Sequence, residues 1–147
     1  MKVYSLAQDT ISKKEIASLS RWLLTSERLT KGKLTLEFEK NFSNYMNRKY
    51  SLFVNSGSSA NLLMLAALIE SNKLKNKKAI VAGVSWSTTI APFMQNNFEI
   101  SLCDCSDKDL GVDTENFEML CKLHQPSVAM IVNVLGHGNN IKEIKRI

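Results

Sequence analysis

The sequence predicts an α/β fold with a mainly parallel sheet and flanking helices. From Lys49 onward, short β-type runs alternate with helical patterns, and polar or glycine-containing segments separate them. This alternation is typical of βαβ units, whose strands pair in parallel. The residues before Lys49 show helical patterns alone. We therefore expect an N-terminal helical segment over 1–48 and an α/β domain over 49–147.

Two helices are expected in the N-terminal segment. "SKKE" at 12–15 is a capping box. The apolar positions behind it, at helical spacing, are Ile16, Leu19 and Leu23. The pattern breaks at Gly32, and a second helix is expected around "TLEFEKNFSNYM". Three aromatic residues fall on one face of that helix: Phe38, Phe42 and Tyr45. We predict that these aromatic side chains belong to a core.

Four strands are expected in the α/β part. They are "YSLFV" (50–54), "KAIVA" (78–82), "EISLC" (99–103) and "SVAMIVNV" (127–134). Helical patterns lie between them at 58–70, 87–96 and 113–123, and Asp113 is a suitable N-cap for the last. The final stretch, "VLGHGNNIKEIKRI", has the pattern of a strand end, a glycine-containing loop and the start of a helix. A parallel crossover needs a further strand to receive it, so we expect this sequence to be a truncated one.

Composition and charge indicate an ordinary globular domain. The chain has 147 residues, of which 44% are hydrophobic and 22% charged, with a formal net charge of +5. Its basic residues occur in dispersed pairs, which is typical of a solvated surface, so we expect no nucleic-acid partner. No stretch approaches the roughly 20 apolar residues of a membrane span. Residues 1–4 do not lead into a signal-peptide core, and we predict a cytoplasmic protein.

The cysteines and histidines suggest neither a disulfide framework nor a metal site. The three cysteines (Cys103, Cys105 and Cys121) form no CxxC pair. Cys103 and Cys105 are expected to share one strand face as buried thiols. The two histidines, His124 and His137, have no cysteine or carboxylate nearby at metal-ligand spacing. We expect both to be surface or loop residues.

The strongest candidate for chemistry is "NSGSSAN" at 55–61, where an apolar run stops at small polar residues and a helical pattern begins. The free amides of a helix's first turn attract anions. Gly57 can adopt positive φ and permits close approach, while Ser58 and Ser59 add hydroxyls. A serine-rich N-cap without a ligand explains the same residues. The stretch is neither a Walker loop nor a GxGxxG fingerprint, so it does not specify a nucleotide.

A second candidate is "GVSWSTTIAPF" at 83–93, just past the expected strand 78–82. Open α/β sheets bind ligands at the carboxyl ends of their strands. Trp86 could stack there on a flat ring, although a loop tryptophan also serves packing alone. A phosphate site and a stacking platform on the same sheet edge together suit one cofactor that has a phosphate and a planar ring.

These stretches carry a resemblance to a known family. From about Leu29 to the end, "VNSGSSANLL", "VSWSTTIAPF", "DLGVDTENFEML" and "AMIVNVLGHGNNIKEI" resemble, in order, the N-terminal half of the DegT/DnrJ/EryC1/StrS family of pyridoxal-phosphate (PLP)-dependent sugar aminotransferases. The resemblance implies the N-terminal part of the PLP-dependent transferase type I (aspartate aminotransferase-like) large domain. It also implies that Ser56, Gly57, Ser58 and Ser59 hold the cofactor phosphate and that Trp86 stacks on the pyridine ring.

The resemblance further implies a transferase acting on nucleotide-linked 4-keto-6-deoxy sugars in lipopolysaccharide biosynthesis, with an amino-acid donor and a homodimeric assembly. The family's aspartate and Schiff-base lysine find no match here, and neither Lys142 nor Lys145 fits the lysine motif. We therefore name no catalytic residue and expect the chain alone to be inactive. Two alternatives stay open: a 3-dehydratase of the same family, in which histidine replaces the lysine, and a non-catalytic fragment or pseudoenzyme.

Overall fold

The computed structural model describes residues 9–26 and 28–147. The reading of residues 1–4 as lacking a signal-peptide core lies outside the described part. The chain divides into two compact units, one ending at Phe53 and the other running from Val54 to Ile147. The predicted boundary between 48 and 49 stays a prediction. Among the described residues, no helix combines the length and apolar content needed to cross a membrane.

The first unit contains helices α1 (Lys13–Thr25) and α2 (Lys33–Tyr45). The predicted capping box is present: the Ser12 N–H donates to Glu15 Oε2 at 2.7 Å, and the Glu15 N–H donates to Ser12 Oγ at 3.3 Å. Hydrogen bonding to the Ser12 side chain, and then to the Ser12 backbone N–H, holds the pKa of the Glu15 carboxyl below its usual value. Helix α2 begins after Gly32, where the sequence pattern breaks.

The aromatic face of α2 does not form a core, which corrects the prediction. Phe38 stacks on Phe42 with ring centroids 5.7 Å apart, and Phe53 meets Phe38 edge-on at 5.3 Å. Phe38 and Phe42 nevertheless keep nearly half of their surface exposed, and Tyr45 keeps most of its own. A single helix with one extended segment offers too little surface to bury three aromatic rings. The apolar face of α2 is thus left largely open within its unit.

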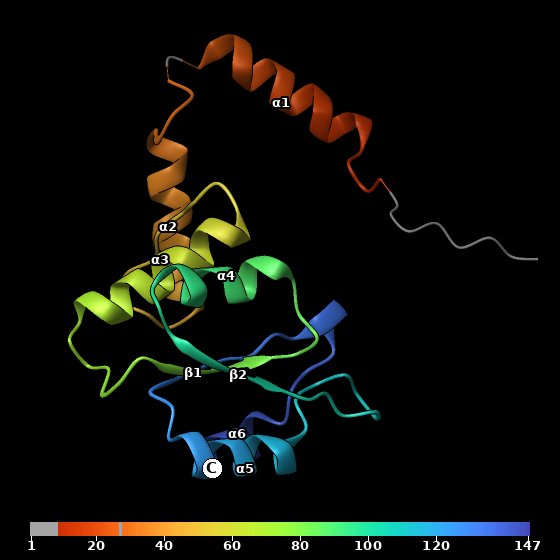
Figure 1. The fold of residues 1–147 in the computed structure, drawn as a ribbon. Coiled ribbons are helices and arrows are strands. Elements are labelled where there is room, and N and C mark those ends of the chain that lie inside the picture. Colours follow the sequence, from red (N-terminus) through yellow and green to blue (C-terminus); the bar gives the residue numbers. More distant parts are fainter. Residues whose placement is uncertain (1–8, 27) are drawn as a thin grey trace, which may run out of the picture. The chain divides into compact units, whose positions relative to one another are not determined.

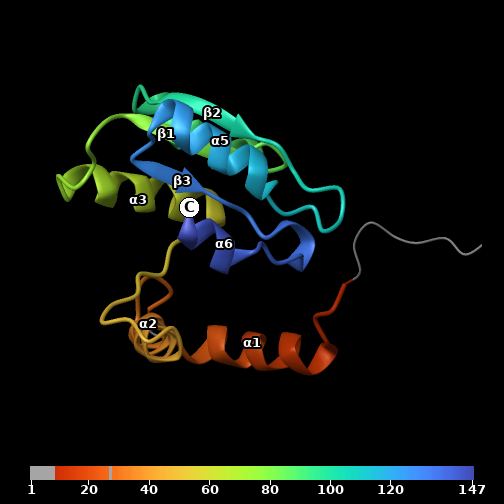
Figure 2. The same cartoon turned by 90° about the horizontal axis from the view of Figure 1, so that it is seen from below.

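The second unit is a three-layer α/β structure. Its elements are α3 (Gly57–Glu70), β1 (Lys78–Ala82), α4 (Ser87–Gln95), β2 (Glu99–Cys103), α5 (Thr114–His124), β3 (Val128–Met130), the 3-10 turn η1 (Val134–Gly136) and α6 (Ile141–Arg146). The three strands are all parallel, in the order β2-β1-β3 (Figure 2). Helices α3 and α4 cover one face of this sheet, and α5 and α6 cover the other (Figure 1).

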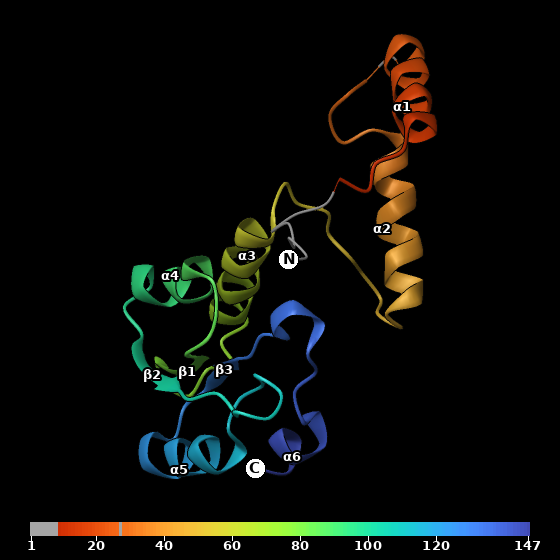
Figure 3. The ribbon, with the colours of Figure 1, turned by 90° about the vertical axis from the view of Figure 1, so that its right-hand side faces the viewer.

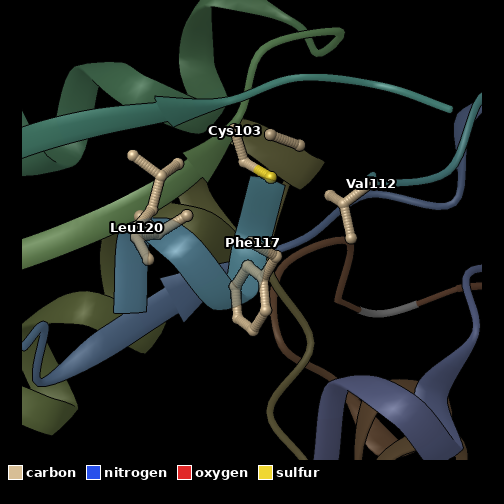
Figure 4. Packing of buried hydrophobic residues seen from close by; sticks show 6 residues of the cluster. Cys103, Val112, Phe117 and Leu120 are labelled. Carbon is tan, nitrogen blue, oxygen red and sulfur yellow. The ribbon is translucent and has the colours of Figure 1, made fainter. Parts of the chain in front are cut away.

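The central strand β1 sends alternate side chains to two cores, as the pleat of a strand requires. Ala79 and Val81 pack with residues of α3 and α4, including Leu65 and Phe93. On the other face, Ile80 and Ala82 belong to a cluster with Cys103, Val112, Phe117 and Leu120 (Figure 4). A continuous run of apolar residues is typical of a strand that is buried on both faces. The sequence of β1 therefore agrees with its position at the centre of the sheet.

Two predicted strands differ from the structure. Residues 50–54 form no strand: the Phe53 N–H donates to Glu39 Oε1 at 2.9 Å, where a strand would donate to a neighbouring strand. The strand predicted over 127–134 is confined to Val128–Met130, because pairing with β1 ends at Met130 and the chain then turns into η1. The strands over 78–82 and 99–103 are confirmed.

The cysteine prediction is half right. Cys103 is buried, and burial, followed by the nearby Asp113 and Asp104 carboxylates, raises the pKa of its thiol to about 11. Cys105 lies beyond the end of β2 and is only half-buried, so the two thiols do not share a strand face. His124 ends α5, with Nδ1 3.8 Å from Glu99 Oε1, and His137 is exposed after η1. No cluster of metal-ligating side chains occurs in the described part of the chain.

Candidate functional site

The start of α3 presents backbone amides that point out of the helix end. Ser56 is the N-cap, and its hydroxyl oxygen accepts the Ser59 N–H at 3.1 Å. Its carbonyl oxygen accepts the Ala60 N–H at 3.0 Å. Within residues 9–26 and 28–147, the N–H groups of Gly57 and Ser58 have no such acceptor. These two amides are therefore the donors available to an anion, and the positive end of the helix dipole adds to their attraction.

This geometry revises the role of Ser59. The sequence-based prediction gives the phosphate to the amides and hydroxyls of Ser58 and Ser59, yet the Ser59 amide is already engaged by the cap. The Ser59 hydroxyl in turn accepts from the Ser56 hydroxyl at 3.1 Å, and the side chain is half-buried. Ser59 therefore offers its hydroxyl rather than its amide to a ligand.

Gly57 is the first residue of α3, and its φ is not positive. The positive φ that glycine permits is therefore not used here. What glycine provides here is room: a Cβ built at this position meets no heavy atom within 4 Å. Side chains of a helix tilt toward its N-terminus, so a Cβ at this position would project toward the region above the free amides. The absent side chain leaves that region open, which fits the close approach of a phosphate group.

The second candidate stretch is tied to the first by hydrogen bonds. The Ser58 hydroxyl donates to Thr88 Oγ1 at 3.0 Å, and the Asn61 side-chain amide donates to the Thr88 carbonyl at 3.2 Å. These bonds join the first turn of α3 to the first turn of α4. Sequence reasoning singled out neither Thr88 nor Asn61 as a site residue, because a contact over about thirty positions leaves no local signal. Thr88 fixes the Ser58 side chain and adds a hydroxyl to the site.

Trp86 lies at the start of α4, four residues beyond Ala82, the last residue of β1. It is the N-cap residue of α4, and its carbonyl oxygen accepts the Thr89 N–H at 2.8 Å. The Ser85 hydroxyl donates to the Ala82 carbonyl at 2.8 Å and ties the connecting turn to the strand. The indole of Trp86 is 76% exposed. An exposed indole at a sheet edge has its faces available to a planar ring, and packing against this chain does not account for it.

A shallow cavity of about 210 Å³ opens where α3 and α4 meet. Its lining residues are Ser58, Ser59, Leu62, Thr88, Ala91, Pro92 and Gln95. Two of the four predicted site residues, Ser58 and Ser59, thus line one cavity together with Thr88. Gly57 and Trp86 do not line it: Gly57 directly precedes Ser58, and Trp86 lies two residues before Thr88. Figure 3 shows how the first turns of α3 and α4 lie next to each other on one side of the sheet.

The site contains no ionisable side chain, so its attraction for an anion comes from amides, hydroxyls and the helix dipole. The residues Ser56, Gly57, Ser58, Ser59, Thr88 and Trp86 are all neutral. Lys142 and Lys145 lie on α6, on the other face of the sheet from α3 and α4 (Figure 1). The arrangement can bind and orient a phosphorylated planar molecule. It offers no group to form a covalent bond with that molecule or to move a proton.

The fold of this chain, a parallel α/β sheet with helices on both faces, is that of the PLP-dependent enzymes of fold type I. Solved structures of that class share the fold of this chain. The chain belongs to the DegT/DnrJ/EryC1/StrS aminotransferase family, whose model matches residues 10–147. The predicted family and fold class are thereby confirmed.

Two relatives that match most of the chain are sugar dehydratases. GDP-4-keto-6-deoxy-D-mannose 3-dehydratases from Yersinia pseudotuberculosis and Escherichia coli O55:H7 are each 35% identical to it over 147 residues, which is 98% of this chain and 37% of theirs. The lipopolysaccharide biosynthesis protein RfbH of Salmonella typhimurium is 31% identical over 89% of this chain and 30% of its own length. The chain thus spans about a third of the length of these relatives.

Solved structures agree with the sequence comparison. A GDP-4-keto-6-deoxymannose-3-dehydratase with a trapped PLP-glutamate geminal diamine is 34% identical and superposes with a TM-score of 0.82, covering 98% of this chain and 38% of that one. The Escherichia coli dehydratase with bound hydrated PLP is 33% identical, with a TM-score of 0.81, covering 99% and 38%. The Helicobacter pylori aminotransferase PseC, at 21% identity and a TM-score of 0.74 over 95% and 36%, shows the shared fold alone.

Proposed function

We propose that this chain forms the N-terminal part of the cofactor-binding domain of a PLP-dependent enzyme that removes the 3-hydroxyl from a GDP-linked 4-keto-6-deoxy sugar. The observation that carries the proposal is 35% identity to two 3-dehydratases over 98% of the chain. The sugar aminotransferase structures compared with it reach only 21% and 18%. The 3-dehydratase alternative is therefore preferred to the aminotransferase reading favoured by the sequence motifs.

The residues present fit PLP. The cofactor has a phosphate, which suits the free amides of Gly57 and Ser58, and a planar ring, which suits the exposed Trp86 indole. The space above Gly57 is open to a phosphate oxygen. When bound, PLP supplies an electron sink for chemistry beside an amino-bearing carbon.

The described residues of this chain would bind and orient the cofactor, and residues outside this sequence would carry out the chemical steps. Gly57 and Ser58 would donate N–H groups to the phosphate, and the Ser59 hydroxyl, which accepts from Ser56 and keeps its own proton, would donate from the same turn. Trp86 would cover one face of the ring and exclude water from it. Thr88 keeps the Ser58 hydroxyl in place through their 3.0 Å hydrogen bond. The histidine that replaces the Schiff-base lysine in such a dehydratase, and the carboxylate at the ring nitrogen, would come from residues that this sequence does not contain.

The test is the fate of the sugar in the full-length protein that carries this chain. With PLP, glutamate labelled at its nitrogen and GDP-4-keto-6-deoxymannose, a 3-dehydratase yields a sugar that has lost the oxygen at carbon 3 and carries no labelled nitrogen. An aminotransferase yields a sugar that retains this oxygen and carries the label. Mass spectrometry distinguishes the two products. Labelled amino sugar contradicts the proposal, and unchanged sugar in the presence of bound PLP supports the non-catalytic alternative.

The remaining predictions about assembly and setting are part of the same proposal. We also propose the homodimer, the amino-acid donor and the cytoplasmic location predicted from the sequence, together with a role in lipopolysaccharide biosynthesis, which the name of the relative RfbH supports. Sedimentation equilibrium of the full-length protein tests the dimer directly, because a dimer doubles the measured mass. A concentration-independent monomer mass contradicts it.

A further inference from the structure

One half-buried side chain, that of Asn139, joins the two loops that leave the carboxyl ends of β2 and β3. Its Oδ1 accepts the Val112 N–H at 2.7 Å, in the loop after β2. Its Nδ2 donates to the Val132 carbonyl at 3.0 Å and to Asn133 Oδ1 at 2.8 Å, in the loop after β3. One carboxamide thus makes three hydrogen bonds to two segments about 20 positions apart, which fixes the position of each loop relative to the other.

The partner carboxamide, that of Asn133, is oriented by these contacts. Its Oδ1 accepts both the Asn139 Nδ2 and the Asn139 backbone N–H, the latter at 3.2 Å. The residue is exposed, and its own NH₂ group donates to no acceptor within the described residues. Asn133 therefore has its oxygen held in place while its two N–H donors stay available.

The strand register places these donors on the edge that holds the candidate site. Val81 of β1 pairs with Met130, the last residue of β3, and Asn133 follows three residues later, in the loop beyond the carboxyl end of that strand. Parallel strands bring their carboxyl ends to one edge, where open α/β sheets bind ligands. Figure 3 shows the loop after β3 leaving the sheet beside β1.

The backbone after Asn133 is held in an unfavourable conformation. Leu135 has φ 52° and Gly136 has φ 83°, and leucine rarely occupies this left-handed region. Such a conformation persists where surrounding contacts determine it, and it is found most often at ligand sites. Asn139 supplies these contacts. It follows the turn in the sequence, and its side chain bonds to Val132 and Asn133, which precede the turn. Packing is tight as well, since a Cβ at Gly111 would lie 3.0 Å from Asn139 Oδ1.

We propose that Asn139 is a positioning residue that holds Asn133 so that the Asn133 amide donates a hydrogen bond to an oxygen of the sugar in the nucleotide-sugar substrate. The inference rests on the proposed function, which supplies the substrate. A neutral amide donor suits a hydroxyl or keto oxygen, whereas the phosphate of the cofactor already has the amides of Gly57 and Ser58. The binding of the sugar nucleotide should therefore depend on Asn133 and Asn139, and the binding of PLP should not.

The test measures equilibrium binding of GDP-4-keto-6-deoxymannose by calorimetry to the full-length protein loaded with PLP, without glutamate. Asn133→Ala removes an exposed side chain and should weaken sugar-nucleotide binding by about tenfold. Asn139→Ala should weaken it by a similar factor, at a temperature where the variant is folded by circular dichroism. The matched control is Asn116→Ala: Asn116 Oδ1 accepts the Asp104 N–H at 3.0 Å in the loop after β2 but makes no hydrogen bond to the loop after β3. Its sugar affinity should stay unchanged, as should the PLP affinity of all three variants.

Each result is decisive. Wild-type affinity for the sugar nucleotide in Asn133→Ala overturns the inference. So does weakened binding in Asn139→Ala alone, because Asn139 is then only structural, or a loss of PLP affinity in step with sugar affinity. If the unsubstituted protein binds PLP but not the GDP-linked sugar, the proposed function fails and this inference fails with it. If the unsubstituted protein binds the GDP-linked sugar and the Asn133→Ala and Asn139→Ala variants bind it equally well, this inference alone fails.

Discussion

Replacing Gly57 with alanine should separate a ligand-binding role of the α3 start from a folding role. The added methyl meets no heavy atom of this chain within 4 Å, and the φ of Gly57 is not positive, so the folded chain can accommodate it without strain. Alanine favours a helix over glycine by up to about 1 kcal/mol, which predicts unchanged or slightly increased stability. The methyl would project toward the free amides of Gly57 and Ser58. A phosphate would then be displaced from at least one amide.

A hydrogen bond to a charged group contributes about 1.5–3 kcal/mol, so Gly57→Ala should weaken PLP binding by about tenfold to a hundredfold. The assay is absorbance titration of the full-length apoprotein with PLP, alongside urea unfolding of the 147-residue chain. The matched control is Gly32→Ala, at the start of α2, where a Cβ lies 3.4 Å from the Arg28 carbonyl oxygen. Its PLP affinity should stay at the wild-type value. Unchanged PLP affinity in a folded Gly57→Ala variant refutes the phosphate assignment.

Three further predictions concern the second unit. Phe93 is 1% exposed, and its ring meets that of Phe98 edge-on with centroids 5.4 Å apart. Phe93→Ala should therefore lower the free energy of unfolding, measured by urea titration, by about 3–5 kcal/mol. A loss below about 1 kcal/mol would contradict this core packing. Asp113 caps α5 by accepting two backbone N–H groups, and Asp113→Ala should cost about 1 kcal/mol in the same assay; no loss means the cap is not formed in solution. Because the pKa of the Cys103 thiol is raised to about 11, a thiol reagent at pH 8 should label Cys105 first and Cys103 only on unfolding; equal rates in the folded chain contradict the burial of Cys103.

The same thiol predicts how stability depends on pH. The pKa of Cys103 is higher in the folded chain than in the unfolded chain, so the folded state binds its proton more tightly. Its contribution to stability is complete below the ordinary thiol pKa of 9.0 and is lost as the pH rises from there to about 11. Replacing Cys103 with alanine should flatten the decline of the urea midpoint across that window. An equally steep decline in the variant means that other groups cause it.

Sequence patterns predicted the elements whose cause is local. The capping box at Ser12 and the N-cap Asp113 mark the starts of α1 and α5, because the side chain that satisfies each helix end lies within three residues of it. The strands 78–82 and 99–103 were predicted with the correct bounds. Each of these strands lies between two helical patterns and is flanked by charged and polar residues. These flanking residues restrict where strand pairing can begin and end.

Elements that depend on distant partners were not predictable in this way. The "YSLFV" segment has the residues of a strand, but in this chain it pairs with no strand of the described sheet, and Phe53 turns its amide to Glu39 instead. The aromatic face of α2 has the spacing of a core, but burial needs a second surface that the pattern does not supply. Strand propensity and helix periodicity describe what a segment can do, and the partner decides the outcome.

The candidate site shows the same division. Ser58, Ser59 and Gly57 could be singled out because small residues at a helix start have a local physical meaning. Which amides are free could not be, because that depends on how the Ser56 side chain caps the helix. The contribution of Thr88 to the site depends on its contact with Ser58, 30 positions away in the sequence. Sequence patterns therefore indicate the candidate segment, and the structure shows which of its amides are free.

The most direct test of the central claim is a crystal structure of the full-length protein with PLP. The account predicts phosphate oxygens about 2.7–3.2 Å from the backbone nitrogens of Gly57 and Ser58. It also predicts the Trp86 indole parallel to the pyridine ring at stacking distance. A phosphate bound away from the start of α3, or a ring that does not meet Trp86, would contradict the assignment of this chain as the phosphate-binding and ring-stacking part of the enzyme.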